Sequence, residues 1–224
     1  MRKDAFLKSY VDIETKTLSK LDKNKQLDEL LRDEEVIRFD STDILEIIDY
    51  LTTQKITIRQ PLYKNLIYPV LSERVTKNDL KSIKVLLQLD QHLLNYQRYT
   101  KDTQYSSFIL LEKGLSISSD DIELLGFYES KTREYFNYTL HEIPSGVLYG
   151  INGATIAECD ELINEVDKYE IVCNKLQFDE SKLIQDCKYY YTNYKDYLLD
   201  CNKYKSFAHY LEINVTSHDN GTQQ

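Results

Sequence analysis

The stretch that decides the fold runs from residue 156 to residue 211 and reads IAECDELINEVDKYEIVCNKLQFDESKLIQDCKYYYTNYKDYLLDCNKYKSFAHYL. Its cysteines recur at a constant spacing of 14 residues, at Cys159, Cys173, Cys187 and Cys201. This spacing equals two heptads, so all four share one position of a heptad repeat. With the cysteines at position a, apolar a and d residues continue through both halves, first as Cys159, Leu162, Val166, Tyr169, Cys173 and Leu176, and then as Leu183, Cys187, Tyr190, Tyr194, Tyr197, Cys201, Tyr204, Ala208 and Leu211.

The heptad pattern predicts two long helices that pack antiparallel as a coiled-coil hairpin, with a turn near Phe178. Such a turn places Cys159 opposite Tyr197, so a small side chain faces a large one, as close packing requires. We therefore expect reduced core thiols; a redox or metal role is the alternative. Tyr194 lies within the repeat, whereas Tyr189, Tyr191 and Tyr210 lie outside it and are left for another helix or a partner.

The rest of the chain also reads as helix, because only six glycines and three prolines interrupt 224 residues. Pro61 suits the first turn of a helix to about Arg74, which Pro69 would kink or end early. Thr76 and Asp79 resemble a capping box that opens a helix to about Arg98. We expect an all-α protein of stacked αα-hairpins, helical-repeat-like or an irregular bundle, ending in the coiled-coil hairpin.

Domain organisation is expected to be simple. Length and core content predict one helical domain over residues 1–213. Residues 144–154, which read PSGVLYGINGA, are a possible soft boundary, because glycines gather there. Residues 214–224 are polar and predict a disordered tail.

Charge and hydropathy indicate where the protein is located and which kind of partner it binds. The N-terminus carries charges throughout and has no apolar signal segment, and no apolar run approaches the length of a membrane span. These features predict a soluble cytoplasmic protein with no membrane partner. A net charge of −9 disfavours nucleic acid and favours a basic partner.

Catalytic and cofactor motifs are not found in the sequence. The chain lacks H-E-x-x-H, the Glu-x-x-His of di-iron bundles, a P-loop and G-x-S-x-G. His141 beside Glu142 is the one candidate for general acid or base chemistry, and a surface histidine is its simpler interpretation. We expect no enzyme activity, no cofactor and no metal.

Acidic residues form two candidate binding clusters. One lies on the outer face of the first hairpin helix, and the other follows Leu27 near the N-terminus; together they comprise Glu158, Asp160, Glu161, Glu165, Asp167, Asp28, Glu29, Asp33, Glu34 and Glu35. Each is either a solvated face, a surface for a basic protein, or the partner of a basic stripe within the molecule. That stripe consists of Lys77, Lys81, Lys84, Gln88 and Gln91 at helical spacing.

These features predict a non-catalytic protein whose acidic, tyrosine-rich surface sequesters a basic protein. An immunity-type inhibitor of a nuclease toxin fits this chemistry, because an acidic blocker is steered toward a basic active site. A helical-repeat scaffold or peptide-binding adaptor is the alternative, and an enzyme that uses carboxylates and His141 is the third. Neither the identity of the partner nor the oligomeric state follows from the sequence.

Overall fold

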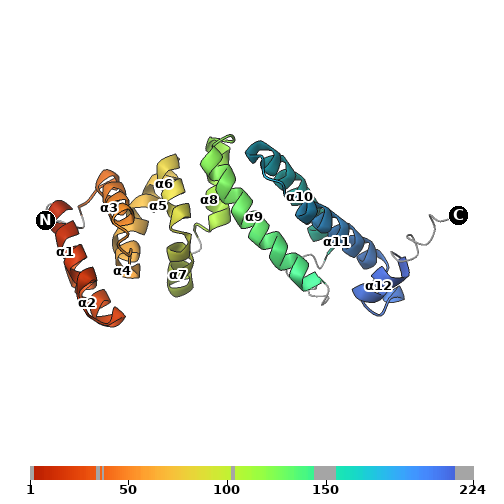
Figure 1. The fold of residues 1–224 in the computed structure, drawn as a ribbon, viewed down its shortest axis with the longest axis horizontal. Coiled ribbons are helices and arrows are strands. Elements are labelled where there is room, and N and C mark those ends of the chain that lie inside the picture. The colour runs from red at the N-terminus through yellow and green to blue at the C-terminus, as the bar shows by residue number, and fades with distance from the viewer. Residues whose placement is uncertain (1–2, 34–35, 37, 102–103, 144–154, 215–224) are drawn as a thin grey trace. The chain divides into compact units, whose positions relative to one another are not determined.

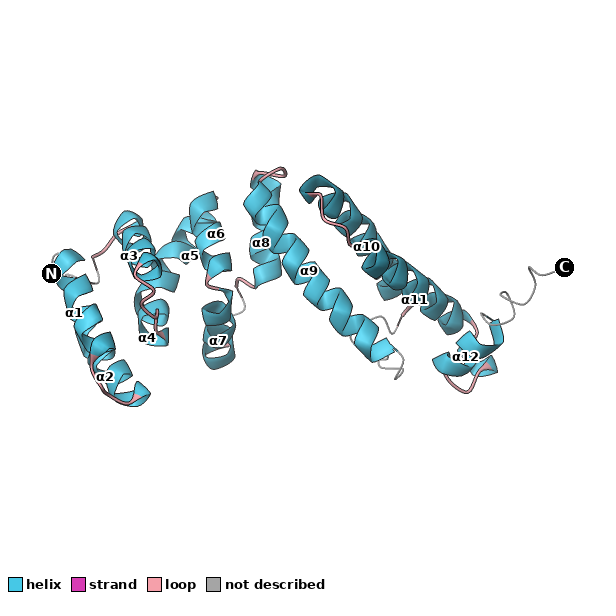
Figure 2. Ribbon diagram, in the orientation of Figure 1, coloured by secondary structure: helices cyan, strands magenta, loops and turns pink. Residues whose placement is uncertain are grey.

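A computed structural model describes residues 3–33, 36, 38–101, 104–143 and 155–214. Within these ranges every regular element is a helix, which confirms the all-α prediction (Figure 2). The chain divides into two compact units, Met1–Leu124 and Leu125–Gln224, called unit 1 and unit 2 below. The predicted boundary at 144–154, and the predicted tail beyond Asn214, lie outside the described residues.

Unit 1 is built from short helices that pack against their neighbours along the chain. α1 contacts α2 and α3, α2 contacts α4, α3 contacts α5, and α6 contacts α5, α7 and α8. The α-helices, labelled in Figure 1, and the π-helix η1 are α1 (Lys3–Thr15), α2 (Lys20–Leu30), α3 (Ser41–Thr53), α4 (Gln60–Leu62), η1 (Tyr63–Ile67), α5 (Tyr68–Thr76), α6 (Leu80–Gln88), α7 (Asp90–Thr100) and α8 (Ser107–Ile117).

The helix predicted from Thr76 to Arg98 is wrong in its bounds. α5 ends at Thr76, Asn78 adopts a left-handed conformation with φ 61°, and α6 begins only at Leu80. The carboxylate of Asp79 accepts a hydrogen bond from Ser82 Oγ at 2.7 Å, so it belongs to the start of α6. A second break at Leu89 separates α6 from α7. The basic residues predicted to form one stripe therefore lie on more than one element.

Pro69 distorts the helix around it rather than ending it. Proline has no N–H, so it cannot donate to the carbonyl four residues earlier. The preceding turn widens into η1, and the N–H of Tyr68 donates to the carbonyl of Tyr63, five residues back. α4, η1 and α5 thus follow one another directly from Gln60 to Thr76.

Unit 2 consists mainly of three long helices, α9 (Ile122–Glu142, beginning just before the unit), α10 (Ile156–Leu176) and α11 (Ser181–Leu199). α10 and α11 pack together antiparallel, because Asp160 contacts Lys195 while Glu170 contacts Lys188 (Figure 1). The capping box of Thr155 and Glu158 begins α10 as the sequence predicts.

Three of the four cysteines are buried in unit 2, as predicted, and Cys201 is half-buried; none forms a disulfide. Burial raises the pKa of the Cys159 thiol to about 11 and that of Cys187 to about 12. Both thiols are therefore protonated at neutral pH, which suits core residues and disfavours nucleophiles or metal ligands.

The heptad series was predicted to continue to Leu211, and this part of the prediction is wrong. α11 ends at Leu199, a 3-10 turn (Cys201–Lys203) follows, and α12 (Phe207–Asn214) packs against α11. This short helix places the ring of Phe207 4.9 Å from that of Tyr194 and 5.7 Å from that of Tyr197, measured between centroids. Covering these tyrosines requires the chain to turn.

The heptad pattern leaves Tyr191 to another helix or a partner, and the structure shows that another helix covers it. Tyr191 is 0% exposed, because α9 covers that side of α11. The Tyr191 hydroxyl forms a hydrogen bond with Thr139 Oγ1, and the Tyr191 ring packs edge-on against Phe136. Tyr210 is buried as well, whereas Tyr189 is 41% exposed. Two of the three tyrosines outside the heptad positions, Tyr191 and Tyr210, are therefore core residues.

Candidate functional site

The acidic residues predicted to form a face on α10 have largely intramolecular roles. Glu158 caps α10: its Oε2 accepts hydrogen bonds from the Thr155 N–H at 3.0 Å and the Thr155 hydroxyl at 2.8 Å. Glu165 accepts hydrogen bonds from the Tyr128 hydroxyl on α9 and from Lys168 at 3.1 Å. These two carboxylates stabilise unit 2 and are poor candidates for a partner.

Two further acids on α10 pair with lysines of α11. Asp160 lies 2.6 Å from Lys195 Nζ, and Asp167 lies 2.9 Å from Lys188 Nζ. These carboxylates raise the pKa of each lysine, chiefly by accepting its hydrogen bonds. Glu161 is exposed and makes no ion pair with the described residues. Among the five predicted residues, it alone is a fully exposed carboxylate without such a pair.

The second acidic cluster, at the end of α2, is only partly described. Asp28 is half-buried and accepts a hydrogen bond from Asn65 Nδ2 at 3.2 Å, while Glu29 and Asp33 are exposed. Glu34 and Glu35 lie outside the described residues. The structure brings Asp28 into a groove that the sequence did not predict.

Two lysines of the basic stripe pair with acids of unit 1. Lys84 Nζ lies 2.6 Å from Asp121 and 3.1 Å from Glu123, and Lys77 pairs with Glu73 on its own helix at 2.6 Å. The pKa of Lys84 is raised, mainly through its hydrogen bond to Asp121. Charge compensation within unit 1 therefore uses acids other than those considered from the sequence.

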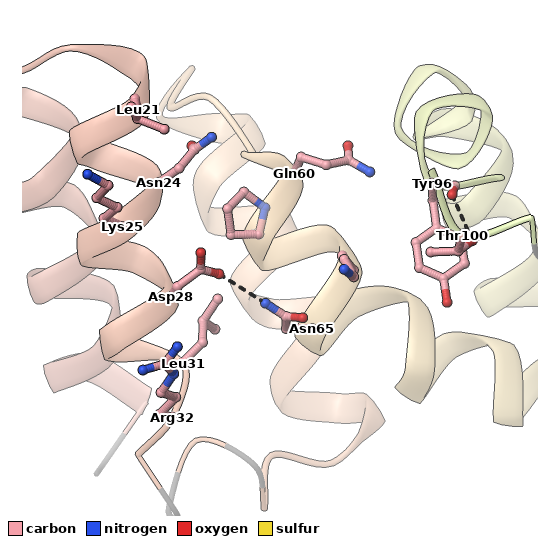
Figure 3. Close-up of a pocket in the computed structure, with 12 residues that line it drawn as sticks. Leu21, Asn24, Lys25, Asp28, Leu31, Arg32, Gln60, Asn65, Tyr96 and Thr100 are labelled. Atoms are coloured by element: carbon pink, nitrogen blue, oxygen red, sulfur yellow. Dashed lines mark hydrogen bonds between the residues drawn. The ribbon is translucent and has the colours of Figure 1, made fainter. Parts of the chain in front are cut away.

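A groove of about 740 Å³ opens between α2, the α4–η1 turn and α7. Figure 3 shows residues of α2 along one wall and Tyr96 and Thr100 of α7 along the other, with Gln60 and Asn65 between them. The lining consists of Leu21, Asn24, Lys25, Asp28, Leu31, Arg32, Gln60, Pro61, Lys64, Asn65, Tyr96 and Thr100. Its size is within the range of sites that take small ligands or short segments.

Three cations line this groove against one carboxylate. Lys25, Arg32 and Lys64 are exposed and make no ion pair with the described residues, while Asp28 already accepts a bond from Asn65. The groove is therefore locally basic in an acidic protein. The sequence gives little sign of it, because Lys25 and Arg32 lie in an acidic stretch and Lys64 comes from a separate part of the chain.

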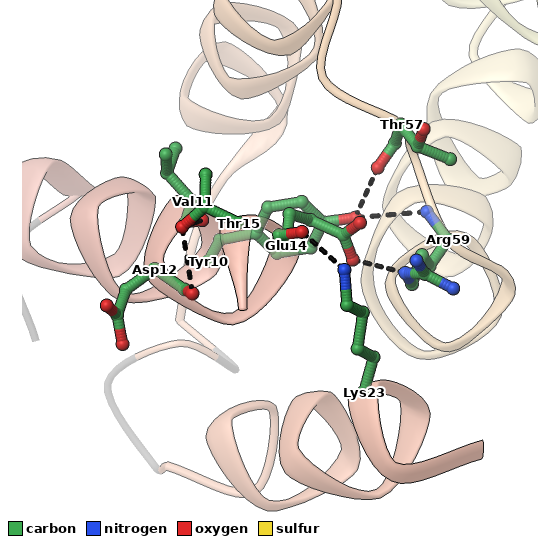
Figure 4. Close-up of polar contacts among 8 residues, drawn as sticks. All are labelled: Tyr10, Val11, Asp12, Glu14, Thr15, Lys23, Thr57 and Arg59. Carbon is green, nitrogen blue, oxygen red and sulfur yellow. Dashed lines mark hydrogen bonds and ion pairs between the residues drawn. The ribbon is translucent and has the colours of Figure 1, made fainter. Parts of the chain in front are cut away.

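A polar cluster built on α1 joins two of the elements that line the groove, α2 and α4 (Figure 4). The Tyr10 hydroxyl donates to the Thr57 carbonyl at 2.9 Å and accepts from the Arg59 N–H at 3.0 Å. Glu14 accepts a bond from the Arg59 guanidinium through its carboxylate and one from Lys23 through its backbone carbonyl. Since Lys23 belongs to α2 and Arg59 immediately precedes α4, this cluster fixes the two elements relative to each other.

A second polar cluster lies inside unit 2. Glu129 on α9 is buried and accepts a hydrogen bond from the Tyr169 hydroxyl on α10 at 3.1 Å. Arg133 lies 3.5 Å from Glu129 and 3.4 Å from Glu180. A buried carboxylate is costly unless it is hydrogen-bonded and paired, and here it is both. The cluster joins α9 to the α10–α11 pair, which indicates a structural role.

The described residues offer little support for catalysis. The side chain of His141 is 84% exposed near the end of α9, with its Nδ1 3.2 Å from Glu142 Oε1. Among the described residues, His, Cys, Asp and Glu form no group of three that could hold a metal ion. None of the described helices combines the length and apolar character of a membrane span.

Comparison with known proteins gives no independent guide to function. No family model matches this sequence, and neither the curated proteins nor the solved structures contain a significant match.

Proposed function

We propose that this chain is a non-catalytic cytoplasmic protein that binds a basic partner protein through unit 2. The division of charge carries the proposal. Residues 125–224 contain sixteen acidic and nine basic residues, a net of −7, whereas residues 1–124 contain twenty-one and nineteen, a net of −2. Most of the net charge of −9 thus belongs to unit 2.

The ion pairs of α10 and α11 do not remove this surplus, because each pair is neutral and the excess acids remain. A surplus of one sign accelerates encounter with a partner of the opposite sign. A nuclease toxin is such a partner, since it carries positive charge where it meets phosphate, and the chain would act as its immunity-type inhibitor.

Two finer features of the fold belong to this proposal. The burial of Cys159, Val166 and Tyr169 on α10, together with Cys187 and Tyr194 on α11, supports coiled-coil packing of these helices. The contacts between consecutive helices support a hairpin stack in unit 1. Either arrangement provides a stable scaffold for surface charges.

The variant that tests this proposal must spare the acids that stabilise unit 2. Glu158 caps a helix and Glu165 bonds Tyr128, so reversing them would disturb the fold. Glu161 and Asp196 are exposed and make no ion pair with the described residues. The double variant Glu161→Lys/Asp196→Lys is therefore appropriate. Asp49→Lys/Glu112→Lys, at exposed positions of unit 1, changes the total charge equally and is the control.

The experiment identifies the partner by affinity capture from the native cell with mass spectrometry, and then measures association rates at several salt concentrations. We expect a basic partner, a several-fold slower association for the unit 2 variant, and a weaker salt dependence. A neutral or acidic partner, or equal slowing by the unit 1 control, would contradict the proposal.

A peptide-binding adaptor is the second candidate function. The observation that favours it is the basic groove of unit 1, which lies outside unit 2.

A further inference from the structure

We infer that the groove between α2, η1 and α7 binds an extended, acidic segment of another protein. The inference rests on the second candidate function, a peptide-binding adaptor, and is separate from the proposed role of unit 2, because it concerns a different unit and a partner of the opposite charge. Three features of the groove carry it: cations that make no ion pair with the described residues, a buried amide oxygen without a hydrogen-bond partner there, and two lining elements, α2 and α4, that are already joined to each other.

The cations provide the charge complementarity. Lys25 and Arg32 on the α2 side and Lys64 on η1 line the groove and have no ion pair with the described residues. Lys84, elsewhere in unit 1, contacts two carboxylates. Carboxylates of a bound segment would give the groove cations the partners that Lys84 already has within the fold.

Asn24 provides a position for the backbone of the segment. Asn24 lines the groove, and its Oδ1 is buried and has no hydrogen-bond partner among the described residues. A buried acceptor that lacks a donor is costly, and a turn of this side chain toward the groove would let the N–H of an extended peptide satisfy it. Asn65 and Gln60 are already engaged, with Asp28 and His92 respectively, so Asn24 is the amide that remains for a ligand.

The apolar lining and the fixed walls favour a segment over a freely solvated ion. Leu21 is 64% exposed in the groove, and Pro61 and Tyr96 lie along the same surface. The cluster of Tyr10, Glu14 and Arg59, with Lys23, joins α2 to α4 before binding, which lowers the entropic cost of association.

A peptide fits the electrostatics better than a nucleic acid. A nucleic acid carries a charge at every phosphate and would be repelled by a protein of net charge −9. An acidic segment can place a few carboxylates at the groove cations and leave its uncharged backbone facing Asn24.

Fluorescence anisotropy of the full chain tests this inference, with a labelled peptide of alternating glutamate and threonine as the probe. Matched peptides with glutamine or lysine in place of glutamate, and an oligothymidylate, are the controls. Lys25→Glu/Lys64→Glu is the groove variant, and Lys8→Glu/Lys81→Glu, at exposed helical positions outside the groove, is its control. Melting curves establish that every variant is folded.

We expect saturable binding of the glutamate peptide that weakens with salt, and a loss of about tenfold or more in the groove variant. Asn24→Leu should weaken binding several-fold without changing the salt dependence, because it removes an acceptor and no charge. Tighter binding of the glutamine peptide or the oligothymidylate, an equal loss in the control variant, or no saturable binding would each overturn the inference. None of these results depends on the acids of unit 2.

Discussion

The α10–α11 pair and the groove of unit 1 use charge in opposite ways. On α10, carboxylates such as Asp160 and Asp167 face lysines of α11 and are compensated within the fold. In the groove, Lys25 and Lys64 make no ion pair with the described residues. A run of like charges in the sequence therefore does not locate a binding surface, because packing decides which charges remain uncompensated.

The largest effect that can test this comparison is the loss of a buried tyrosine from unit 2. Tyr191→Ala and Tyr194→Ala should each lower the free energy of unfolding by about 3–5 kcal/mol, because both side chains are fully buried. Tyr189→Ala, at an exposed position of the same helix, should cost about 1 kcal/mol or less. Urea unfolding monitored by circular dichroism provides the measurement. If Tyr191→Ala lowers the free energy of unfolding only slightly, Tyr191 is not buried and the packing of α9 against α11 is contradicted.

A smaller effect is expected from the buried carboxylate of unit 2. Glu129→Ala removes the acceptor of the buried Tyr169 hydroxyl and should cost about 1–3 kcal/mol. Glu129→Gln retains an acceptor oxygen and should cost less. Glu134→Ala, on the exposed side of α9, is the matched control and should stay within about 0.5 kcal/mol of the parent. If Glu129→Ala and Glu134→Ala unfold at the same urea concentration, the cluster does not stabilise unit 2.

The α10–α11 pair could be predicted from the sequence because the signals that define it lie close together in the chain. The heptad spacing of Cys159 and Cys173, and the capping box at Thr155, depend on residues within one helix or its neighbour. The sequence left open whether another helix or a partner covers Tyr191, because its burial depends on α9, a helix that the heptad pattern does not include.

The groove could not be predicted in this way. Its lining joins Asn24 on α2, Lys64 on η1 and Tyr96 on α7, which meet only through tertiary packing. The π-helix that carries Lys64 arises because Pro69 lacks an N–H, and the sequence indicated only a kink or an early end there.

The smallest effect concerns the pH dependence of unit 1. Burial lowers the pKa of His92 below its ordinary value of 6.5, so the folded chain binds a proton less readily than the unfolded chain. Stability from this residue is present above about pH 6.5 and is lost as the pH falls toward the folded-state value. His92→Phe retains a ring beside Tyr63 and should flatten this part of the stability profile. Identical profiles for the parent and His92→Phe would exclude a contribution from His92.

The central claim is that the cations of the groove and the surplus acid of unit 2 mark two separate binding surfaces. Amide chemical-shift mapping of the full chain tests it most directly, with the glutamate–threonine and lysine–threonine peptides added in turn. We predict that the acidic peptide shifts amides of α2, η1 and α7, and that the basic peptide shifts amides of α10, α11 and α12. Shifts of the same amides by both peptides, or shifts spread evenly over both units, would contradict the claim.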